Sequence, residues 1–304
     1  SNPVLGQIWY NTTSQSLKGV EFSTVGSWAT GGNMIAAIKE LGGLGTQTAG
    51  LSVGGNEGGS SNQCEEYNGS SWTAGGNMSV PRFDVAAAGL QTAGLAFGGF
   101  APSQSPTSSV STEEYNGTAW TGGGNLGTGR YGGAGAGTQT AGLAFGGFLP
   151  PNTTATEEYN GSSWTAGGAL SAATKYLAGC GTQTAGLAFG GETPSAADAN
   201  ATFEYDGSSW TNGGNLNTAR QRLAGSGIQT AALAFGGNVV PLGATEEYNG
   251  TAWTTTTTMS FGRRALAGCG ATSALSLAFG GTPPDTAATE EFSAGPVTVT
   301  ISGS

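Results

Sequence analysis

The stretch GTQTAGLAFGG at residues 137–147 decides the fold, because this stretch or a close variant of it occurs six times along the chain of 304 residues. Its central part alternates larger and smaller residues, so that Leu143 and Phe145 fall on one face of a strand and Gly142 and Ala144 on the other. We predict that the protruding Leu-Phe face of one repeat packs on the hollow Gly-Ala face of its neighbour, which requires the repeats to stack and close into a ring. The first glycine of the closing Gly-Gly pair lies at Gly54, Gly98, Gly146, Gly190, Gly236 and Gly280.

A second motif, TEEYNGSSW and its variants, gives the length of the repeat. Its tryptophans are Trp28, Trp72, Trp120, Trp164, Trp210 and Trp253, with spacings of 44, 48, 44, 46 and 43 residues. This period is typical of one four-stranded propeller blade. The sequence therefore predicts an all-β protein, a six-bladed β-propeller with four antiparallel strands in each blade.

One repeat shows how the four strands of a blade are expected to follow one another. They are predicted at residues 131–137, 141–146, 155–159 and 163–167. The stretch 134–137, Ala-Gly-Ala-Gly, is nearly free of side chains and is expected to be the innermost strand, where backbones crowd around the axis. The Asn160-Gly161 pair between the last two strands predicts a type I′ hairpin turn.

Composition excludes several classes of protein. The chain has 57 glycines, 37% apolar and 9% charged residues, which disfavours helices, and its net charge of −10 disfavours binding to nucleic acid or to an anionic membrane. No apolar run reaches the roughly 18 residues of a membrane-spanning helix. Because the chain has no histidine, a Cys/His zinc site and a histidine-based triad are excluded, and we expect no metal and no cofactor. Cys180 and Cys269 occupy equivalent repeat positions and are expected to be small buried apolar residues.

The order of motifs within each repeat carries a family resemblance. A Gly-Gly pair is followed by Glu-Glu-Tyr-Asn-Gly, by a tryptophan about five residues past the tyrosine, and by a basic residue that opens the next unit. This order resembles the kelch repeat over roughly residues 18–293. One departure lies in blade four, where Phe203-Glu204-Tyr205-Asp206 replaces Glu-Glu-Tyr-Asn. A WD40 propeller normally shows a Gly-His pair, which this chain lacks.

Each repeat also carries charges that recur with the motif. The basic residues taken to open the six units are Lys39, Arg82, Arg130, Lys175, Arg220 and Arg263. Each is expected to bridge to a glutamate of the third strand of its blade, which would fix the register of the strands. Adjacent glutamates such as Glu157 and Glu158 point to opposite faces of a strand and recur in nearly every blade, so they are poor candidates for the paired carboxylates of a glycosidase.

No other pattern indicates catalysis. The copper radical oxidase chemistry of one kelch-fold enzyme family needs imidazole ligands, which this chain cannot supply. A sialidase would need several arginines around one substrate carboxylate, and only Arg222 and one of Arg263 and Arg264 lie outside the recurring set. The protein is therefore expected not to be an enzyme, and no catalytic residue is assigned.

The two ends of the chain are expected to share a blade. Second-strand motifs number six, but third-strand-like motifs number seven, counting Val20-Glu21-Phe22 near the start and Glu290-Glu291-Phe292 near the end. We infer that residues 27–32 supply the outer strand of the last blade and so close the ring. The expected division is a lead-in segment at 1–17, the propeller at 18–293, and a tail at 294–304, in which residues 297–301 form a further strand or lead to another domain.

The segment before the propeller carries a second resemblance. Residues 6–13, GQIWYNTT, followed by Leu17-Lys18, resemble a short motif of phage tail-fibre proteins, and the Gly/Thr/Ala-rich repeats are similar to those of phage virion proteins. This resemblance implies a component of an extracellular virion, such as a fibre, tip or decoration protein. Flanking virion proteins would then hold it in an oligomer.

One face of the predicted ring varies while the other is uniform. The turns between third and fourth strands are nearly identical, whereas the loops between second and third strands differ in length and content. Variable loops on a rigid scaffold are typical of a recognition surface, although unconstrained loops that drift would give the same contrast. The candidate contacts, from these loops and from the connections to the next blade on the same face, are Phe83, Phe100, Gln104, Tyr131, Phe148, Leu149, Asn152, Tyr176, Arg222, Val239, Val240 and Leu242.

Three functions fit these observations. The favoured one is host receptor binding or adhesion, with a host cell-surface glycan or protein as the partner. A capsid decoration or fibre-spacer protein would instead bind neighbouring virion subunits through apolar loops such as residues 148–150 and 239–242. A carbohydrate-active enzyme is the third candidate. It is disfavoured because the sequence shows no single cluster of charged residues that departs from the repeat pattern.

Overall fold

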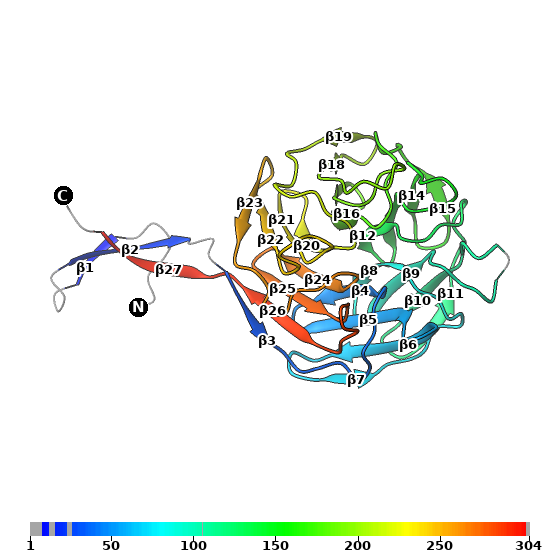
Figure 1. The fold of residues 1–304 in the computed structure, drawn as a ribbon, viewed down its shortest axis with the longest axis horizontal. Helices are drawn as coiled ribbons and strands as arrows, with labels where there is room; N and C mark the ends of the chain where they lie inside the picture. Colours follow the sequence, from blue (N-terminus) through cyan, green and yellow to red (C-terminus); the bar gives the residue numbers. More distant parts are fainter. Residues whose placement is uncertain (1–7, 12–15, 23–25, 105, 302–304) are drawn as a thin grey trace.

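The computed structural model is a ring of six four-stranded antiparallel sheets around a central axis, as the repeats predict (Figure 1). It describes residues 8–11, 16–22, 26–104 and 106–301, and these contain no helix. None of them, accordingly, forms a helix that could cross a membrane. The expected all-β, six-bladed propeller with four strands per blade is confirmed.

Each blade runs outward from the axis in chain order. The innermost strands are β4 (Gly42–Thr46), β8 (Ala86–Leu90), β12 (Ala134–Thr138), β16 (Ala178–Thr182), β20 (Ala224–Ile228) and β24 (Ala267–Thr272). The second strands are β5 (Ala49–Asn56), β9 (Ala93–Phe97), β13 (Ala141–Phe145), β17 (Ala185–Phe189), β21 (Ala231–Phe235) and β25 (Leu275–Phe279). The third strands are β6 (Ser60–Tyr67), β10 (Thr112–Tyr115), β14 (Thr156–Tyr159), β18 (Thr202–Tyr205), β22 (Thr245–Tyr248) and β26 (Thr289–Ser293). The outer strands are β7 (Trp72–Ala74), β11 (Trp120–Gly122), β15 (Trp164–Ala166), β19 (Trp210–Asn212), β23 (Trp253–Thr256) and β3 (Ser27–Thr30). We number the blades 1 to 6 in the order of their innermost strands.

Neighbouring blades pack by inserting large side chains into glycine hollows. A Cβ atom added to Gly135 of blade 3 would come within 2.7 Å of the Phe97 ring of blade 2, and one added to Gly142 would come within 2.7 Å of Leu95. The same pairing of phenylalanine with glycine recurs between Phe145 and Gly179, Phe189 and Gly225, Phe235 and Gly268, and Phe279 and Gly43. The expected fit of protruding and hollow faces is therefore confirmed, and it explains why no repeat could be stable alone.

Polar side chains of the repeat motif also join neighbouring blades. Between blades 2 and 3, the Tyr159 hydroxyl donates to Glu114 at 2.5 Å, and the Trp164 indole Nε1 donates to the Thr112 hydroxyl at 2.9 Å. Gln139 Nε2 donates to two backbone carbonyls of blade 2, at 3.0 and 2.7 Å. The recurring Tyr, Trp and Gln are thus satisfied across the blade boundary, which explains their spacing.

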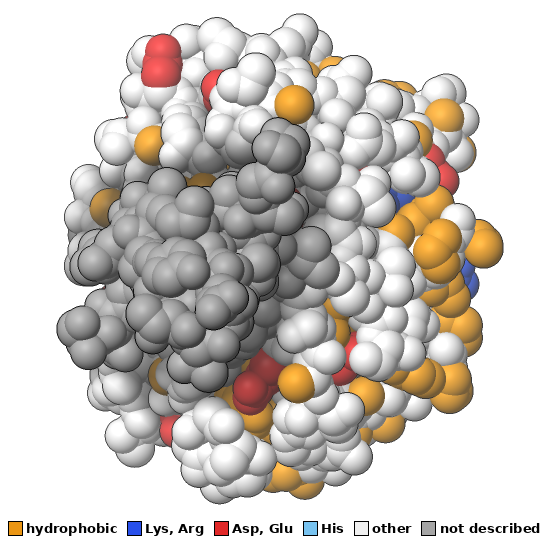
Figure 2. Space-filling model, turned by 90° about the vertical axis from the view of Figure 1, so that its left-hand side faces the viewer, with side chains coloured by type: hydrophobic (Ala, Val, Ile, Leu, Met, Phe, Trp, Pro, Cys, Tyr) orange, Lys and Arg blue, Asp and Glu red, His pale blue; other side chains and the backbone are white. Residues whose placement is uncertain are grey.

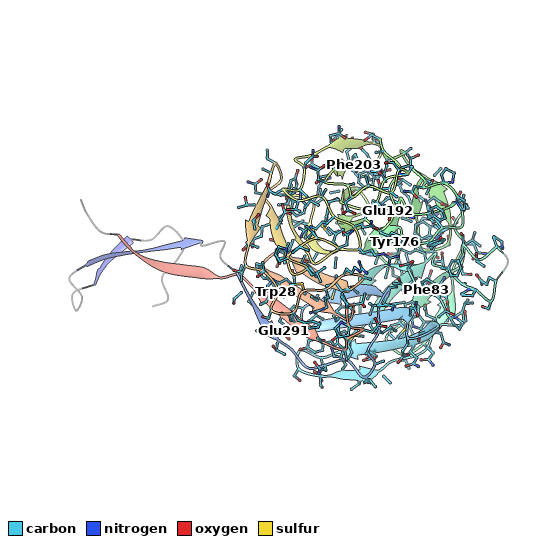
Figure 3. All side chains as sticks on the ribbon, viewed as in Figure 1. Trp28, Phe83, Tyr176, Glu192, Phe203 and Glu291 are labelled. Atoms are coloured by element: carbon cyan, nitrogen blue, oxygen red, sulfur yellow. The ribbon has the colours of Figure 1, made fainter. Side chains whose placement is uncertain are left out.

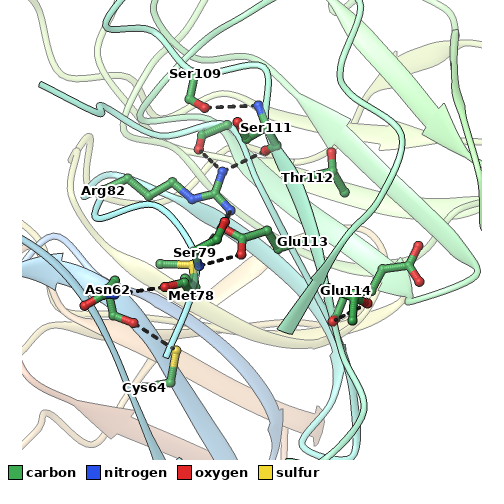
Figure 4. Close-up of polar contacts among 12 residues, drawn as sticks. Asn62, Cys64, Met78, Ser79, Arg82, Ser109, Ser111, Thr112, Glu113 and Glu114 are labelled. Carbon is green, nitrogen blue, oxygen red and sulfur yellow. Dashed lines mark hydrogen bonds and ion pairs between the residues drawn. The ribbon is translucent and has the colours of Figure 1, made fainter. Parts of the chain in front are cut away.

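The expected ion pair between a basic residue and a third-strand glutamate is present in four blades. The pairs are Arg82 with Glu113, Arg130 with Glu157, Arg220 with Glu246, and Arg263 with Glu290, all with buried side chains. Figure 4 shows the first of them, in which the guanidinium also donates to the Gly98 and Ser111 carbonyls. Each of these arginines therefore ties the start of its blade to the third strand.

The same expectation is wrong for Lys39 and Lys175. These lysines lie one residue later in the repeat than the arginines, and the arginine position is held by Ile38 in blade 1 and Thr174 in blade 4. Lys39 pairs with Asp285 at 3.0 Å and Lys175 with Glu192 at 3.1 Å, both between loops. In blade 4 the glutamate is replaced as well, by the buried Phe203.

The predicted turn type is wrong, although the predicted hairpin is present. Tyr159 pairs with Trp164, so the connection has four residues instead of two. Only Gly161 has a positive φ, of 90°. The Asn160 side chain instead accepts hydrogen bonds from the backbone N–H groups of Ser162 and Ser163, at 3.0 and 2.9 Å. Asparagine is favoured here because its side chain caps the turn, not because it tolerates a left-handed backbone.

Ring closure is as predicted. Strand β3 pairs with β26, with Trp28 opposite Phe292, so the start and the end of the chain share blade 6. The expected further strand near the C-terminus is also present as β27 (Pro296–Ile301), which pairs with β2 (Ser16–Phe22) beside β1 (Ile8–Asn11). The Val20-Glu21-Phe22 motif therefore lies in this separate sheet and is not a third strand of a blade. Figure 1 shows this sheet beside the ring, next to β3 and β26. The expected boundaries at residues 17 and 293 stay a prediction.

Candidate functional site

The variable connections of the propeller meet on one face, which we call the loop face. In five of the six blades a backbone bridge joins the connection into the blade to the loop after its second strand, as between Phe83 and Phe100 or between Tyr131 and Phe148. The tight turns between first and second and between third and fourth strands form the opposite face, which we call the turn face. The two kinds of variable connection are therefore neighbours on one surface, as expected.

Six equivalent residues close a ring of backbone hydrogen bonds around the axis at the loop face. They are Glu40, Asp84, Gly132, Tyr176, Arg222 and Ala265, and we call them the axial ring. Each N–H donates to the carbonyl of the preceding blade's member at 2.6 to 2.9 Å, and each residue has a positive φ of 50° to 62°. A left-handed backbone costs a non-glycine residue roughly 1–2 kcal/mol. Five of the six members are not glycine, and their types differ, so this strained position carries much of the variation between otherwise similar blades.

Arg222 is the central side chain of the axial ring. From blade 5, its Nη1 atom lies 2.9 Å from Glu40 Oε1 in blade 1 and 3.9 Å from Asp84 Oδ1 in blade 2, on the opposite side of the ring. The guanidinium also lies 3.9 Å from the centre of the Tyr176 ring. Burial, with a smaller contribution from Glu40, raises the pKa of Asp84 to about 7, although Arg222 opposes the shift. Arg222 and the other five ring members together line an axial pocket of about 90 Å³.

An arc of aromatic side chains follows the loop face over blades 2 and 3. The rings of Phe83, Phe100, Tyr131 and Phe148 contact one another in sequence, with centroids 5.1, 5.2 and 5.3 Å apart. Lys175 continues the arc, because its Nζ lies 4.7 Å from the Phe148 ring and 5.1 Å from the Tyr176 ring. Figure 3 labels Tyr176 close to the centre of the disc and Phe83 farther out. The arc and the axial ring are therefore continuous.

A polar hollow of about 380 Å³ lies on the other half of the loop face, between blades 5, 6 and 1. It is lined by Lys39, Glu40, Gln221, Arg222, Asn238, Arg264, Ala265 and Thr282. The side amides of Gln221 and Asn238 both donate to Asp198 at 3.0 Å, which fixes their orientation. The mouth of the propeller is thus aromatic on one side and polar with basic groups on the other. In the edge-on view of Figure 2, hydrophobic side chains gather along one face of the disc, with Lys or Arg atoms among them.

The predicted contact residues fall into three groups. Phe83, Phe100, Tyr131, Phe148, Tyr176 and Arg222 are brought together in the aromatic arc and the axial ring. Leu149 and Val240 are exposed at loop tips, with exposed fractions of 39% and 91%, and Val239 and Leu242 are half-buried beside Val240.

The third group supports the loops themselves. The Asn152 side chain is buried and donates to the Glu192 carbonyl at 2.8 Å, and Gln104 contacts Ser111 within its own loop. Sequence reasoning missed Lys39, Glu40, Asp84 and Arg264. A repeat alignment offers a signal for them, because they hold the first or second position after the arginine position of the repeat, and residue types differ there between most blades.

Neither kind of sequence comparison places the chain in a known group: no protein-family model matches it, and no curated protein matches it. Within the described residues no cluster of three or more His, Cys, Asp or Glu side chains is arranged to hold a metal ion. Cys180 and Cys269 are buried, and burial raises the pKa of each thiol to about 12, as befits small apolar residues. The fold and its loop face define a six-bladed β-propeller, a class of protein compatible with a recognition or binding role.

Proposed function

We propose that the protein is a non-enzymatic virion component that recognises its host through the loop face of the propeller. The observation that carries this proposal is the concentration of unlike side chains on that face. The axial ring holds five different non-glycine residues in a strained backbone conformation, whereas the packing residues repeat almost unchanged around the ring. Strain kept at one variable position is typical of a functional site.

The charges of the blades support binding over catalysis. In four blades the first glutamate of the third strand is paired with a buried arginine, and in blade 1 Glu65 accepts two backbone N–H groups. The second glutamate accepts a tyrosine hydroxyl of the next blade in five cases, as Glu114 does from Tyr159. The recurring carboxylates are thus engaged in holding the ring together.

The assignment to a phage rests on resemblance. The repeats are similar to kelch repeats and to the Gly/Thr-rich repeats of phage virion proteins, and residues 6–13 resemble a tail-fibre motif. Residues 8–11 of that motif form strand β1, which lies in the sheet beside the ring together with β2 and β27. Attachment of the propeller to a fibre or tail through this sheet would leave the loop face free for a host surface.

A capsid decoration or fibre-spacer role is the second candidate. It is favoured by one specific observation, the exposure of Val240 and Leu149 at the tips of two loops. Large apolar residues at such exposure are suited to docking on a neighbouring subunit. The proposed partner is then a virion protein instead of a host receptor.

A pair of matched double variants tests both candidates. Leu149→Asp with Val240→Asp alters the loop face, and Leu90→Asp with Ile228→Asp alters the turn face at residues of comparable exposure, 53% and 47%. We expect particles with the loop-face variant to adsorb to host cells roughly tenfold less, and those with the turn-face variant to adsorb normally. Loss of incorporation into particles by the loop-face variant would favour the decoration role, and equal adsorption of both variants would contradict recognition through this face.

A further inference from the structure

We infer that the polar hollow between blades 5, 6 and 1 binds one carboxylate group of an acidic saccharide, and that Arg264 receives this group. The inference rests on the proposed function, because it names the chemical class of ligand that the loop face would recognise. It is carried by the distribution of basic side chains, by their pairing within the hollow, and by the uncharged groups around them.

Basic side chains are scarce in this acidic protein, and those that the structure describes outside the core lie on one face. The chain has 9 Lys and Arg residues against 19 Asp and Glu. Among the described side chains, Arg82, Arg130, Arg220 and Arg263 are buried, and the remaining basic residues are Lys39, Lys175, Arg222 and Arg264. All four of these lie on the loop face, and three of them line the same hollow. In a protein of net charge −10, the accessible basic side chains that the structure describes therefore gather on the loop face.

Pairing within the hollow leaves one cation available. Glu40 is the only acidic residue of the lining, and it is already paired with Arg222 at 2.9 Å. Lys39 is paired with Asp285, and Asp198 accepts the amides of Gln221 and Asn238. The Arg264 side chain is exposed and makes no hydrogen bond or ion pair with any residue that the structure describes. One free guanidinium fits one carboxylate, which it can bind with two parallel hydrogen bonds.

The uncharged groups favour a saccharide over an acidic peptide. Beside the charges, the hollow presents the Gln221 and Asn238 amides and the Thr282 hydroxyl, and Ala265 is its only apolar residue. Amides, hydroxyls and fixed charges match the hydroxyl groups of a sugar, whereas peptides are usually anchored by apolar pockets or a free strand edge. The adjoining Tyr176 and the aromatic arc would extend the site for a further sugar ring.

Binding of the whole chain to an array of oligosaccharides tests the inference. The array carries oligosaccharides of uronic acids and other carboxylated sugars, each printed beside its carboxyl-reduced counterpart, together with acidic peptides. We expect the native protein to bind at least one acidic oligosaccharide and to lose that binding when the carboxylate is reduced to an alcohol. Arg264→Gln should weaken the same binding by roughly tenfold or more, as expected for loss of a charge-assisted hydrogen bond, with a smaller loss for Arg264→Lys.

The control is Lys18→Gln, which makes the same change in net charge within strand β2, outside the ring. It should bind as the native protein does, and equal melting temperatures would show that the variants are folded. Equal binding to acid and reduced sugars, no binding to any acidic sugar, capture of acidic peptides alone, or an unchanged Arg264→Gln variant would overturn the inference. If the loop-face double variant still abolishes adsorption to host cells in that case, the proposed function stands without it.

Discussion

At the scale of single residues, Trp120 differs from the other five repeat tryptophans in its partner. Those five donate their indole N–H to a threonine hydroxyl of the preceding blade, at 2.9 to 3.2 Å. The equivalent position facing Trp120 is Cys64, whose sulfur is only a weak acceptor, and among the residues that the structure describes the buried Trp120 Nε1 forms no hydrogen bond of normal geometry. A buried donor without a partner destabilises the fold. The boundary between blades 1 and 2 therefore differs from the other blade boundaries in having cysteine in place of the threonine that accepts this hydrogen bond.

We predict that Cys64→Thr stabilises the protein by about 1 kcal/mol, because it supplies the missing acceptor. The free energy of unfolding from urea titration measures the effect. Thr112→Cys is the matched reverse change, since Thr112 accepts the Trp164 N–H at 2.9 Å, and it should destabilise by a similar amount. A loss of stability in Cys64→Thr would contradict this explanation of the Trp120 site.

The raised pKa of Asp84 predicts that the stability of the fold depends on pH. Its folded-state pKa of about 7 lies above its ordinary value of 3.8, so the folded protein retains a proton that the unfolded chain releases. Stability should therefore fall as the pH rises from about 4 to about 7 and be level above that, as far as this group contributes. Asp84→Asn, which keeps a side chain suited to the left-handed backbone, should remove the fall and be the more stable protein at pH of about 8. Parallel unfolding profiles of the two proteins would show that Asp84 does not titrate in this range.

At the scale of elements, the contribution of the buried arginine to stability can be tested by giving blade 3 the two residues that blade 4 carries in place of the ion pair. Arg130→Thr alone leaves the buried Glu157 without its cation and should cost about 3–5 kcal/mol. Blade 4 carries Thr174 and Phe203 at the two equivalent positions, so Arg130→Thr with Glu157→Phe should recover most of that loss. The melting temperatures of the single and double variants measure this recovery of stability. A double variant no more stable than Arg130→Thr would show that the two positions are not coupled.

The elements themselves could be predicted from the sequence, because their packing is local and repeated. Alternation in residues 141–146 indicated which face of β13 protrudes and which is hollow, and Asn160-Gly161 marked a hairpin. The turn type could not be predicted, since a capping side chain and a left-handed backbone both favour asparagine. Lys39 and Lys175 were assigned to the arginine position because counting one basic residue in each blade does not detect a shift of one position along the chain. In a strand, such a shift turns the side chain to the opposite face.

At the scale of the whole molecule, closure of the ring depends on β3. Its Trp28 ring contacts Phe235 and Phe292, at centroid distances of 5.1 and 5.2 Å, and its indole donates to Thr245. Removing residues 1–31 should expose the edge of β26 and lead to aggregation, because an unpaired strand edge is free to pair with another chain. Both deletions are made in a chain that ends at residue 295, so that β27 does not remain without its partner β2. In that chain, removing residues 1–24 leaves β3 in place and should give a monomeric ring. Light scattering on both variants checks this, and a monomeric 1–31 deletion would contradict closure by β3.

The candidate site could be predicted only in part, because it depends on how distant blades meet. The loop face and the aromatic positions followed from the repeat, since each lies in a connection of known direction. Arg222, Glu40 and Asp84 lie in three different blades, and the first two are 182 residues apart. Only the closed ring brings their side chains together, so no periodicity within one blade reveals that they pair or that a polar hollow lies beside them.

Footprinting of side chains on the bound protein tests most directly whether the loop face is the binding surface. Hydroxyl radicals would label the protein alone and on a host envelope fraction, and mass spectrometry would read the labelling of Leu149, Val240 and Tyr131 on the loop face against Leu90 and Ile228 on the turn face. We predict protection of the first three residues and unchanged labelling of the other two. Protection of Leu90 and Ile228 with Leu149 and Val240 still fully labelled would contradict recognition through the loop face.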